Sequence, residues 1–409
     1  MRVGIFHPGT QHSWQTALAF QEAGAIGWYA TSAFYDPGRW PYKLERYVPR
    51  QMSHRLNREF RRRYNSFLDP AKVRQFGLWE WSEVLSRRLG NQRLSGYCNE
   101  RGNRAFGKQT IRLMEREPVD IVWGYNTSAL EVFRWAKKRG IRCVLDQTIG
   151  HANSLNHYLL EEQERHPEFF VQSYHPFPQD MIDRQNEEIA EADLVAVGST
   201  FCARTLVENG CPPEKIRVLN YGFDESLFPS QRPQRAAAGN RAVNCLFVGE
   251  VGPRKGLAYL LKAFMNIPPD KAHLTLVGNL TIPPDTFAQY AGRVRHVPQV
   301  PRSEVARFFA EADCFVFPSL FEGSAIVLYE ACGAGLGIIQ TDRCGDGVRS
   351  GVNGLMLREI SVPALTEAME MILNNPFLLE RWQAASWASR GERTWANYRR
   401  NVVKLALGM

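Results

Sequence analysis

Short apolar runs that end in Gly, Asp or Asn alternate along this chain with stretches of helical periodicity, which is the pattern of parallel βα units. The runs predict strands in two groups. They lie near residues 2–6, 26–31, 119–123, 141–145, 193–197 and 216–219, and then near 243–248, 273–277, 293–297, 313–317 and 336–340. The pattern predicts an α/β protein with two doubly wound, Rossmann-like halves. The carboxyl ends of their strands are expected to face a cleft, where such sheets bind ligands.

The stretch between the two groups, residues 229–241, is polar, rich in small residues and without periodicity, so it predicts a linker. The 409 residues suffice for two domains, each with its own core. No run approaches the ~18 apolar residues of a membrane span, and the first 20 residues lack the apolar segment of a secretory signal. We expect a soluble or peripheral protein.

Eight cysteines are scattered along the chain without a C-x-x-C pair or a zinc-like grouping. Several, such as Cys143 and Cys314, lie inside apolar runs, which predicts buried, reduced thiols. A disulfide scaffold is not expected at this size, and the compartment is therefore predicted to be reducing and cytoplasmic.

Positive charge is concentrated in one segment. The net charge is +8, yet residues 39–117 alone carry 19 Lys and Arg against 8 Asp and Glu, a surplus of 11. Leu56, Phe60 and Tyr64 recur there at helical spacing, with arginines between them. This basic helical insertion either lies on an anionic membrane surface, binds nucleic acid, or forms a solvated face over a core. Nucleic acid is the least favoured, because no binding motif accompanies the charge.

A glycine-bearing turn in the second half suggests a phosphate site. Residues 244–256 read as a strand, the turn Gly-Glu-Val-Gly-Pro-Arg-Lys-Gly, and the start of a helix. Glycines let backbone approach a phosphate, the helix N-terminus adds N–H groups, and Arg254 and Lys255 add full charges. The spacing matches neither G-x-G-x-x-G nor G-x-x-x-x-G-K-[ST]. The alternative is a surface turn with two solvated cations.

Residues 311–341 carry a second pattern. A buried strand breaks at Pro318, a loop offers Glu322, and a helix begins near Ser324 and ends at Gly333 or Gly335. A carboxylate beside a helix N-terminus can accept hydrogen bonds from sugar hydroxyls, and Glu330 on the helix can bind both hydroxyls of a ribose. The alternative is a Glu322 that caps the helix and a solvated Glu330.

The order of these motifs resembles the family 4 retaining glycosyltransferases, also called glycosyl transferases group 1. The resemblance is carried by the following segments: Gly-x5-Lys-Gly at 249–256, Leu-Val-Gly at 276–278, Ala-Asp-x-Phe-Val-x-Pro-Ser at 312–319, Glu-x7-Glu at 322–330 and Gly-Val-Asn-Gly-Leu at 351–355. It implies a GT-B fold with an acceptor-side domain at 1–228, a linker at 229–241 and a donor domain at 242–390. Residues 391–409 are implied to form a helix that packs back on the first domain.

The resemblance also implies roles for individual residues. Lys255 would hold the donor diphosphate, helped by Gly249, by Arg254 and by the helix N-terminus. Glu330 would bind the nucleotide ribose and Glu322 the transferred sugar. The helix N-terminus comprises Ser324, Ala325 and Ile326. Two departures from the family stand out: Glu250 occupies a position where the family often has Arg, which Arg254 is expected to replace, and the usual Glu-Gly-Phe-Gly is Glu-Gly-Ser-Ala at 322–325.

In the first half, the resemblance points to Gly9 and Thr10 as a loop near the donor. It also points to His151 as a catalytic histidine close to the transferred sugar, with Asp146 and His157 as weaker candidates. The alternative for His151 is a loop histidine bonded to backbone.

The resemblance implies a hexosyltransferase-like enzyme that moves a sugar from a nucleoside-diphosphate donor to an acceptor hydroxyl with retention, in glycan, polysaccharide or glycolipid biosynthesis. No Asp-x-Asp occurs, so no metal and no other cofactor is expected. Alternatives are a GT-B sugar-nucleotide epimerase and a non-catalytic module that binds a membrane surface. A nicotinamide-dependent oxidoreductase is disfavoured by the lack of G-x-G-x-x-G after a strand.

Overall fold

The computed structural model describes residues 1–9, 11–32, 34–35, 43, 47, 67–76, 92–233 and 241–408, with backbone alone at 92–101, 103 and 104. Contacts divide the chain into two compact units. The first contains Met1–Asp146, Asp183–Ala196 and Arg399–Met409, and the second contains Gln147–Ile182 and Val197–Tyr398. Each unit is described by itself.

Two sheets form the framework. The first has the strand order β3-β2-β1-β4-β5-β6-β7, and the second has the order β10-β9-β8-β11-β12-β13. The strands of the first sheet are β1 (Val3–His7), β2 (Ile26–Thr31), β3 (Val73–Gln75), β4 (Ile121–Tyr125), β5 (Arg142–Gln147), β6 (Leu194–Val197) and β7 (Ile216–Val218). Those of the second are β8 (Val243–Val248), β9 (Ala272–Val277), β10 (Val294–Val297), β11 (Cys314–Phe317), β12 (Gly337–Thr341) and β13 (Gly354–Leu357).

Both sheets are parallel and doubly wound. β1 pairs in parallel with β2 and with β4, and β8 pairs in parallel with β9 and with β11. The strand order therefore reverses direction at β1 and at β8. In sheets of this kind the crevice at the carboxyl ends of such strands is where ligands bind. The two predicted Rossmann-like halves are confirmed.

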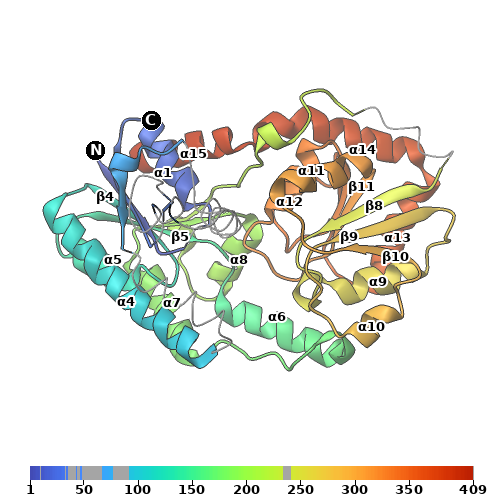
Figure 1. Ribbon diagram of the computed structural model, residues 1–409, viewed down its shortest axis with the longest axis horizontal. Coiled ribbons are helices and arrows are strands. Elements are labelled where there is room, and N and C mark those ends of the chain that lie inside the picture. Colours follow the sequence, from blue (N-terminus) through green and yellow to red (C-terminus); the bar gives the residue numbers. More distant parts are fainter. Residues whose placement is uncertain are drawn as a thin grey trace. The chain divides into compact units, whose positions relative to one another are not determined.

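Most of the helices connect consecutive parallel strands, and α13 and α14 follow the last strand. In the first unit they include α1 (Ser13–Glu22), α4 (Gln92–Arg116), α5 (Leu130–Lys137) and, for its greater part, α7 (Gln179–Glu191). In the second they include α6 (Ala152–Arg165), α8 (Thr200–Glu208), α9 (Leu257–Met265), α10 (Pro284–Ala288), α11 (Arg302–Glu311), α12 (Ile326–Gly333), α13 (Val362–Asn374) and α14 (Pro376–Ser389). Figure 1 shows α9 and α13 on one face of the second sheet and α12 and α14 on the other. The apolar runs 245–248 in β8 and 314–317 in β11 reflect this cover on both faces.

The eleven predicted strands are all present, with ends shifted by one or two residues. The sequence analysis missed β3 and β13, which lie at the edges of their sheets. Each has a single buried residue, Val73 in β3 and Gly354 in β13. Such short, half-exposed strands carry too little apolar signal to be recognised by periodicity.

The last helix, α15 (Trp395–Leu407), begins in the second unit and ends in the first. Within the first unit, Arg399 donates to Glu22 and to Gln15, each at 2.8 Å. The guanidinium of Arg142 donates to the carbonyl of Ala406 at 3.3 Å. These bonds fasten the end of the chain to the first unit.

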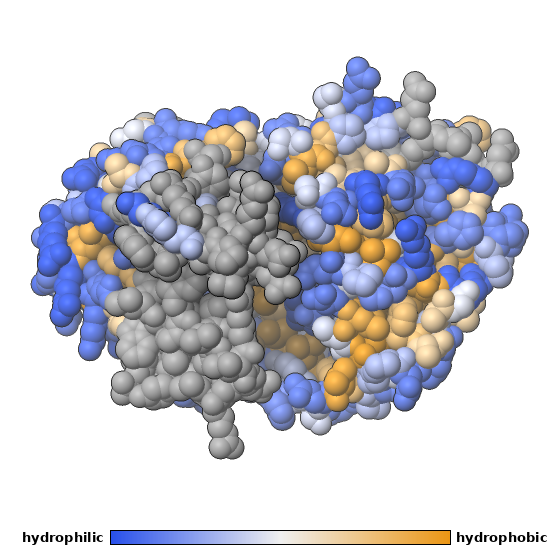
Figure 2. Space-filling model, in the orientation of Figure 1, coloured by the Kyte–Doolittle hydropathy of each residue, from blue (hydrophilic) through white to orange (hydrophobic). Residues whose placement is uncertain are grey.

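Several predictions concern residues that are not described. The basic helical turns at 55–66 and the aromatic stretch at 77–88 lie outside the described residues, as do Thr10 and most of the linker, 234–240. None of the described helices is both long and apolar enough to cross a bilayer. The seven cysteines with described side chains are buried, and none of them is in a disulfide. On the coloured part of the surface in Figure 2, hydrophobic and hydrophilic residues are interspersed.

Candidate active site

The turn after β8 is held against the turn after β11. A short 3-10 helix, Pro253–Lys255, ends at Gly256, which has φ 69° and begins α9. A Cβ on Gly256 would lie 2.0 Å from the carbonyl oxygen of Pro318. Glycine is therefore required here by both the left-handed conformation and the close approach. This contact brings Arg254 and Lys255 onto the loop that carries Glu322.

Two cations and a hydroxyl converge on the carboxylate of Glu322. Lys255 Nζ donates to Glu322 Oε1, and Arg254 Nη1 lies 3.1 Å from the same oxygen. Ser319 Oγ also donates to Oε1, at 2.6 Å. The Lys255 side chain is 11% exposed and its ammonium lies 5.1 Å from the ring centroid of Phe317. The alternative of two solvated cations is thus wrong, and Glu322 does not cap α12.

The Glu322 carboxyl is buried, and burial alone would raise its pKa. The charges of Lys255 and Arg254, with the bonds from Lys255 and Ser319, outweigh burial and lower the pKa of Glu322 below its ordinary value. The site therefore holds an ionised carboxylate and two cations, a combination that can bind both hydroxyls and phosphate oxygens.

A cavity of about 480 Å³ opens beside this cluster, at the carboxyl ends of β8 and β9. Its lining includes Gly249 and Glu250 after β8, Gly278 and Asn279 after β9, Arg302 of α11, and Ile326, Val327 and Glu330 of α12. Gly278 has φ 148°, and a Cβ there would lie 1.7 Å from the Gly249 carbonyl oxygen. The turn after β9 can approach the turn after β8 this closely only because Gly278 has no side chain.

Glu330 lies on the wall of this cavity and is buried. Burial raises the pKa of the Glu330 carboxyl, against the opposing effect of Arg302, whose guanidinium lies 3.2 Å from Oε1. The alternative of a solvated Glu330 is therefore wrong. A buried carboxylate at the edge of a cavity can accept two hydroxyl donors, which suits a ribose.

Helix α12 points its first turn at the same cavity. Ala325 is the N-cap, and Ile326 and Val327, the first two helical residues, line the cavity. The first amides of a helix lack intrahelical partners and carry partial positive charge, which attracts phosphate. Ser324 does not point its hydroxyl at a ligand in this structure, because its Oγ bonds to Tyr329 Oη at 2.7 Å.

His151 is the N-cap of α6 and is buried. Its Nδ1 accepts a hydrogen bond from the amide of Asn153 at 3.2 Å, and its own amide donates to Thr205 Oγ1 at 3.0 Å. The loop before it contacts the Glu322 loop, since a Cβ on Gly323 would lie 1.8 Å from the Thr148 carbonyl oxygen. The sequence analysis gave a loop histidine bonded to backbone as the alternative for His151, and this arrangement agrees with that alternative. A catalytic role of His151 stays a prediction. His157 is exposed.

Asp146 and Gly9 belong to the first unit. The buried Asp146 accepts a bond from Trp123 Nε1 at 3.2 Å, and His12 Nε2 lies 3.2 Å from the same oxygen. Gly9 accepts a bond from Thr31 Oγ1 through its carbonyl, at 3.4 Å. The roles of these residues near a donor stay predictions.

The structure brings together the predicted residues of the second half and adds others. Gly249, Ile326 and Glu330 line one cavity, and Arg254, Lys255 and Glu322 form the adjoining cluster. The sequence analysis missed Arg302 and Ser319 as partners of the two glutamates. Ser319 stood in the Pro-Ser break after the strand and could have been named there. Nothing in the spacing of Arg302 relates it to Glu330.

Residues 242–375 match the model of the family Glycosyl transferases group 1. This part of the chain is therefore similar to that family. The match covers β8 to α13, which supply the cavity and the carboxylate cluster, and it confirms the resemblance seen in the motifs. The narrower assignment to family 4 agrees with it and remains a proposal.

Curated relatives carry the name D-inositol 3-phosphate glycosyltransferase. The one from Mycobacterium ulcerans is 27% identical over 249 residues, which cover 55% of this chain and 54% of that protein. The one from Catenulispora acidiphila is 28% identical over 258 residues, covering 54% and 60% respectively. The chain thus matches about half to three fifths of the length of these relatives.

Solved structures of glycosyltransferases share the fold of the whole chain. Anabaena HepE in complex with UDP-glucose superposes with a TM-score of 0.64 at 14% identity, covering all of both chains. The lipopolysaccharide outer core galactosyltransferase WaaB gives 0.61 at 14% identity, covering 100% of this chain and 99% of the other. Sucrose-phosphate synthase from Thermosynechococcus elongatus gives 0.64 at 16% identity, covering 99% and 98%. The GT-B fold is thereby confirmed.

Proposed function

We propose that the protein is a hexosyltransferase-like enzyme that moves a sugar from a nucleoside diphosphate to an acceptor hydroxyl. The observation that carries the proposal is the cavity beside the Lys255–Glu322 pair, with Glu330 on its wall and the first turn of α12 at its edge. The family match covers this region, and a neighbour of the same fold is described as a complex with UDP-glucose.

The parts of a nucleotide sugar correspond to parts of the site. The ribose hydroxyls are bound by Glu330, and the diphosphate lies at the first turn of α12 near Lys255 and Arg254. The transferred sugar lies against Glu322. Cleavage of the bond between sugar and phosphate leaves negative charge on the diphosphate, and preorganised cations stabilise that charge better than mobile ones. The ion pairs of Lys255 and Arg254 with Glu322 supply such preorganisation.

Transfer with retention is proposed to proceed by same-face displacement, in which the acceptor hydroxyl attacks as the diphosphate leaves. The environment of Glu322 supports this. Its Oε1 already accepts from Lys255 and Ser319 and lies beside Arg254. A carboxylate engaged by two cations and a hydroxyl is a weak nucleophile, so a covalent glycosyl–Glu322 intermediate is disfavoured. Product stereochemistry, determined by NMR from a donor of known anomeric configuration, tests retention.

The cations and the helix also make a metal unnecessary for holding the diphosphate, and we propose metal-independent transfer. Assays in EDTA and with added Mg²⁺ or Mn²⁺ test this point. Equal rates are expected, and a rate that depends on the divalent ion would overturn it.

Calorimetric titration of the full chain with UDP, GDP and ADP tests the site itself. One nucleotide is expected to bind saturably and to bind more weakly to Glu330→Ala. Absence of binding by all three, in a protein shown to be folded by circular dichroism, would contradict the proposed function.

A cytoplasmic location and an acceptor at the inner membrane surface, in glycan, polysaccharide or glycolipid synthesis, are part of the proposal. The support is the surplus of 11 positive charges in residues 39–117. A basic helical face with interleaved apolar residues is attracted to anionic lipid. Flotation with anionic and with neutral liposomes tests it. Preferential flotation with anionic vesicles is expected, and equal, negligible flotation with both would remove the idea.

A further inference from the structure

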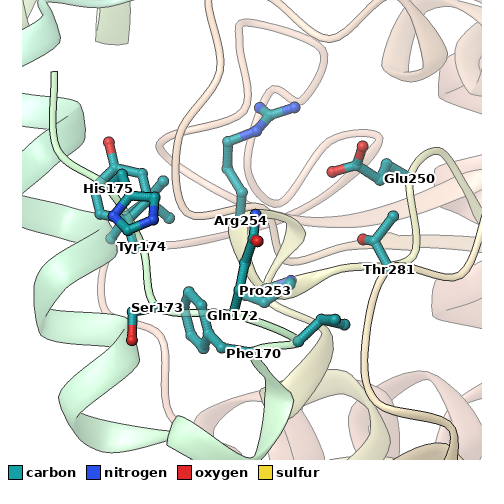
Figure 3. A pocket seen from close by; sticks show the side chains of 11 residues that line it. Phe170, Gln172, Ser173, Tyr174, His175, Glu250, Pro253, Arg254 and Thr281 are labelled. Atoms are coloured by element: carbon teal, nitrogen blue, oxygen red, sulfur yellow. The ribbon is translucent and has the colours of Figure 1, made fainter. Parts of the chain in front are cut away.

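A second, larger cavity of about 700 Å³ lies on the other side of the Glu250 turn. One wall is the segment 170–175, which follows α6 and the 3-10 helix Pro167–Phe169, and the other is formed by Glu250, Pro253, Arg254 and Thr281. In the view of Figure 3, Tyr174 and His175 lie on one side and Glu250 and Thr281 on the other, with Arg254 between them. None of the roles assigned above uses the 170–175 wall.

That wall is fixed to α6 rather than loosely placed. The amide of Tyr174 donates to Gln163 Oε1 at 2.8 Å, and the Tyr174 hydroxyl donates to Asn156 Oδ1 at 2.9 Å. Asn156 also bonds to both the amide and the carbonyl of Phe177, at 2.8 and 3.0 Å. Two of these bonds hold Tyr174, and the other two hold Phe177 just after the wall. A wall anchored at this end loses less conformational freedom when a ligand arrives, which lowers the entropic cost of binding.

The lining combines apolar faces with hydrogen-bonding groups. Leu159, Phe170, Val171, Tyr174 and Pro253 present apolar surface. Gln172, Ser173 and Thr281 carry neutral polar groups around them. A sugar ring has the complementary chemistry, because its C–H faces pack on apolar and aromatic groups while its hydroxyls both donate and accept.

The position of the cavity relates it to the reacting groups. Glu250 lines both this cavity and the one assigned to the nucleotide. Arg254 lines this cavity and bonds to the Phe321 carbonyl at 2.8 Å, beside Glu322. A molecule in the second cavity would therefore lie next to the groups assigned to the leaving diphosphate and to the transferred sugar.

We propose that this second cavity binds a sugar ring of the acceptor, with Glu250 accepting hydrogen bonds from its hydroxyls. The inference rests on the proposed function, which it deepens by giving the acceptor a site and a chemical class. It also explains why a carboxylate follows Gly249, since a guanidinium there would lack the acceptor oxygens that hydroxyls need.

The charges predict a neutral ring rather than a phosphorylated one. Glu250 and Arg254 are the lining residues with a permanent charge, of opposite sign, and Arg254 is already assigned to the donor diphosphate. A phosphate group would meet the carboxylate of Glu250 without an uncommitted cation to offset it. The ring at this site should therefore differ from the inositol phosphate that the names of the relatives mention.

Ligand-observed saturation-transfer NMR on the full chain tests the proposal. The probes are methyl α-D-glucopyranoside, N-acetyl-D-glucosamine, myo-inositol and myo-inositol 1-phosphate, each with and without UDP. Val171→Phe narrows the cavity at an exposed position, Glu250→Gln removes the carboxylate, and Val207→Phe on α8 is the matched control. Folding of each variant is checked by circular dichroism and thermal unfolding.

At least one neutral probe is expected to bind, at least fivefold more weakly to Val171→Phe and to Glu250→Gln, and unchanged to Val207→Phe. The proposal is overturned if no neutral probe binds, if Val171→Phe binds it as wild type does, or if the phosphorylated inositol binds the cavity more tightly than the neutral one. Titration of the same samples with UDP, GDP and ADP separates the two proposals. If wild type binds none of the three nucleotides, the proposed function is contradicted. The sugar signals recorded without nucleotide still show whether the second cavity binds a sugar.

Discussion

The ammonium of Lys255 donates a hydrogen bond to Oε1 of Glu322, which lies 67 residues later in the sequence, at the point where the turns after β8 and β11 meet. Both side chains are 11% exposed. The ion pair with Glu322 orients the cation that is proposed to meet the diphosphate. A charge held in place before the reaction needs no reorganisation during it.

Lys255→Met is expected to reduce transfer by about 100-fold or more, since a preorganised donor at a developing charge contributes on that scale. Its unfolding temperature should also fall, because the buried carboxylate of Glu322 loses one of its two counter-charges. The double variant Lys255→Met/Glu322→Gln should recover much of the stability and none of the activity. Rate assays and thermal unfolding check both statements.

Lys262→Met is the matched control for this pair. Lys262 also carries a carboxylate partner, Glu168 at 2.9 Å, but both are partly exposed and lie outside the proposed site. Its transfer rate should stay within about twofold of wild type, because exposed pairs contribute little. Equal losses of transfer rate in the Lys262 and Lys255 variants would show that the effect of Lys255→Met does not arise from the proposed site.

Glu330→Gln is expected to weaken nucleotide binding about 10- to 100-fold, as hydrogen bonds to a charged acceptor contribute about 1.5–3 kcal/mol. Glu367→Gln is the control, because Glu367 lies eight residues after Glu359, the same separation as Glu322 and Glu330, and is exposed. Calorimetry should show no change for it. If Glu330→Gln bound nucleotide as wild type does, the ribose assignment would be wrong.

The same residue predicts a pH dependence. Burial raises the pKa of the Glu330 carboxyl, so it takes up a proton at a higher pH than an ordinary Glu as the solution is acidified. The ionised form accepts two hydroxyl donors, and binding should therefore weaken as pH falls through that raised pKa. Nucleotide affinity measured at decreasing pH should decline in wild type and stay flatter in Glu330→Gln, while identical profiles would contradict the assignment.

Much of this site could be predicted from local sequence, because its parts lie in turns between strand and helix. Gly249 and Lys255 stand in one such turn and Glu322 in another, and parallel strands bring their carboxyl ends to one edge. Arg302 was not predictable in the same way. It joins the site from the start of α11 by a contact that depends on where that helix packs.

His151 shows a different limit of the sequence. The residue follows β5, as the resemblance requires, but its position cannot reveal that Nδ1 caps α6. The 170–175 wall was missed for a related reason. Its shape comes from bonds to Asn156 and Gln163 on α6, and neither partner belongs to a recognisable motif.

Variants of Arg254 test whether it replaces the arginine that the family often has at the position of Glu250. Its Nη1 bonds to the Phe321 carbonyl and lies near Glu322, so it holds the sugar-side loop as well as carrying charge. Arg254→Ala is expected to lower nucleotide affinity about tenfold or more. Adding Glu250→Arg should restore part of that affinity if the two positions supply the same charge. A double variant no better than Arg254→Ala would show that Arg254 does not replace the missing arginine.

Glu162 of α6 is buried against α9, where Tyr259 Oη donates to its Oε2 at 2.9 Å. Within the described residues its other oxygen, Oε1, has no hydrogen-bond partner. Burial raises the pKa of Glu162 to about 7, opposed by the bond from Tyr259 and by the charges of Arg165 and Lys262. At neutral pH and above, folding therefore holds a carboxylate in a place that prefers the neutral acid.

The sign of the resulting pH dependence follows from the direction of the shift. Because the folded pKa of about 7 lies above the ordinary value of 4.5 for a glutamate, the free energy of unfolding falls as pH rises between these values. The full shift corresponds to a cost of about 3 kcal/mol at most above pH 7. Glu162→Gln should therefore gain stability relative to wild type as pH rises from about 5 to 8. Thermal unfolding across this range checks it, with the partly exposed Glu161→Gln as the control on the same helix. A pH-independent difference between Glu162→Gln and wild type would contradict the raised pKa.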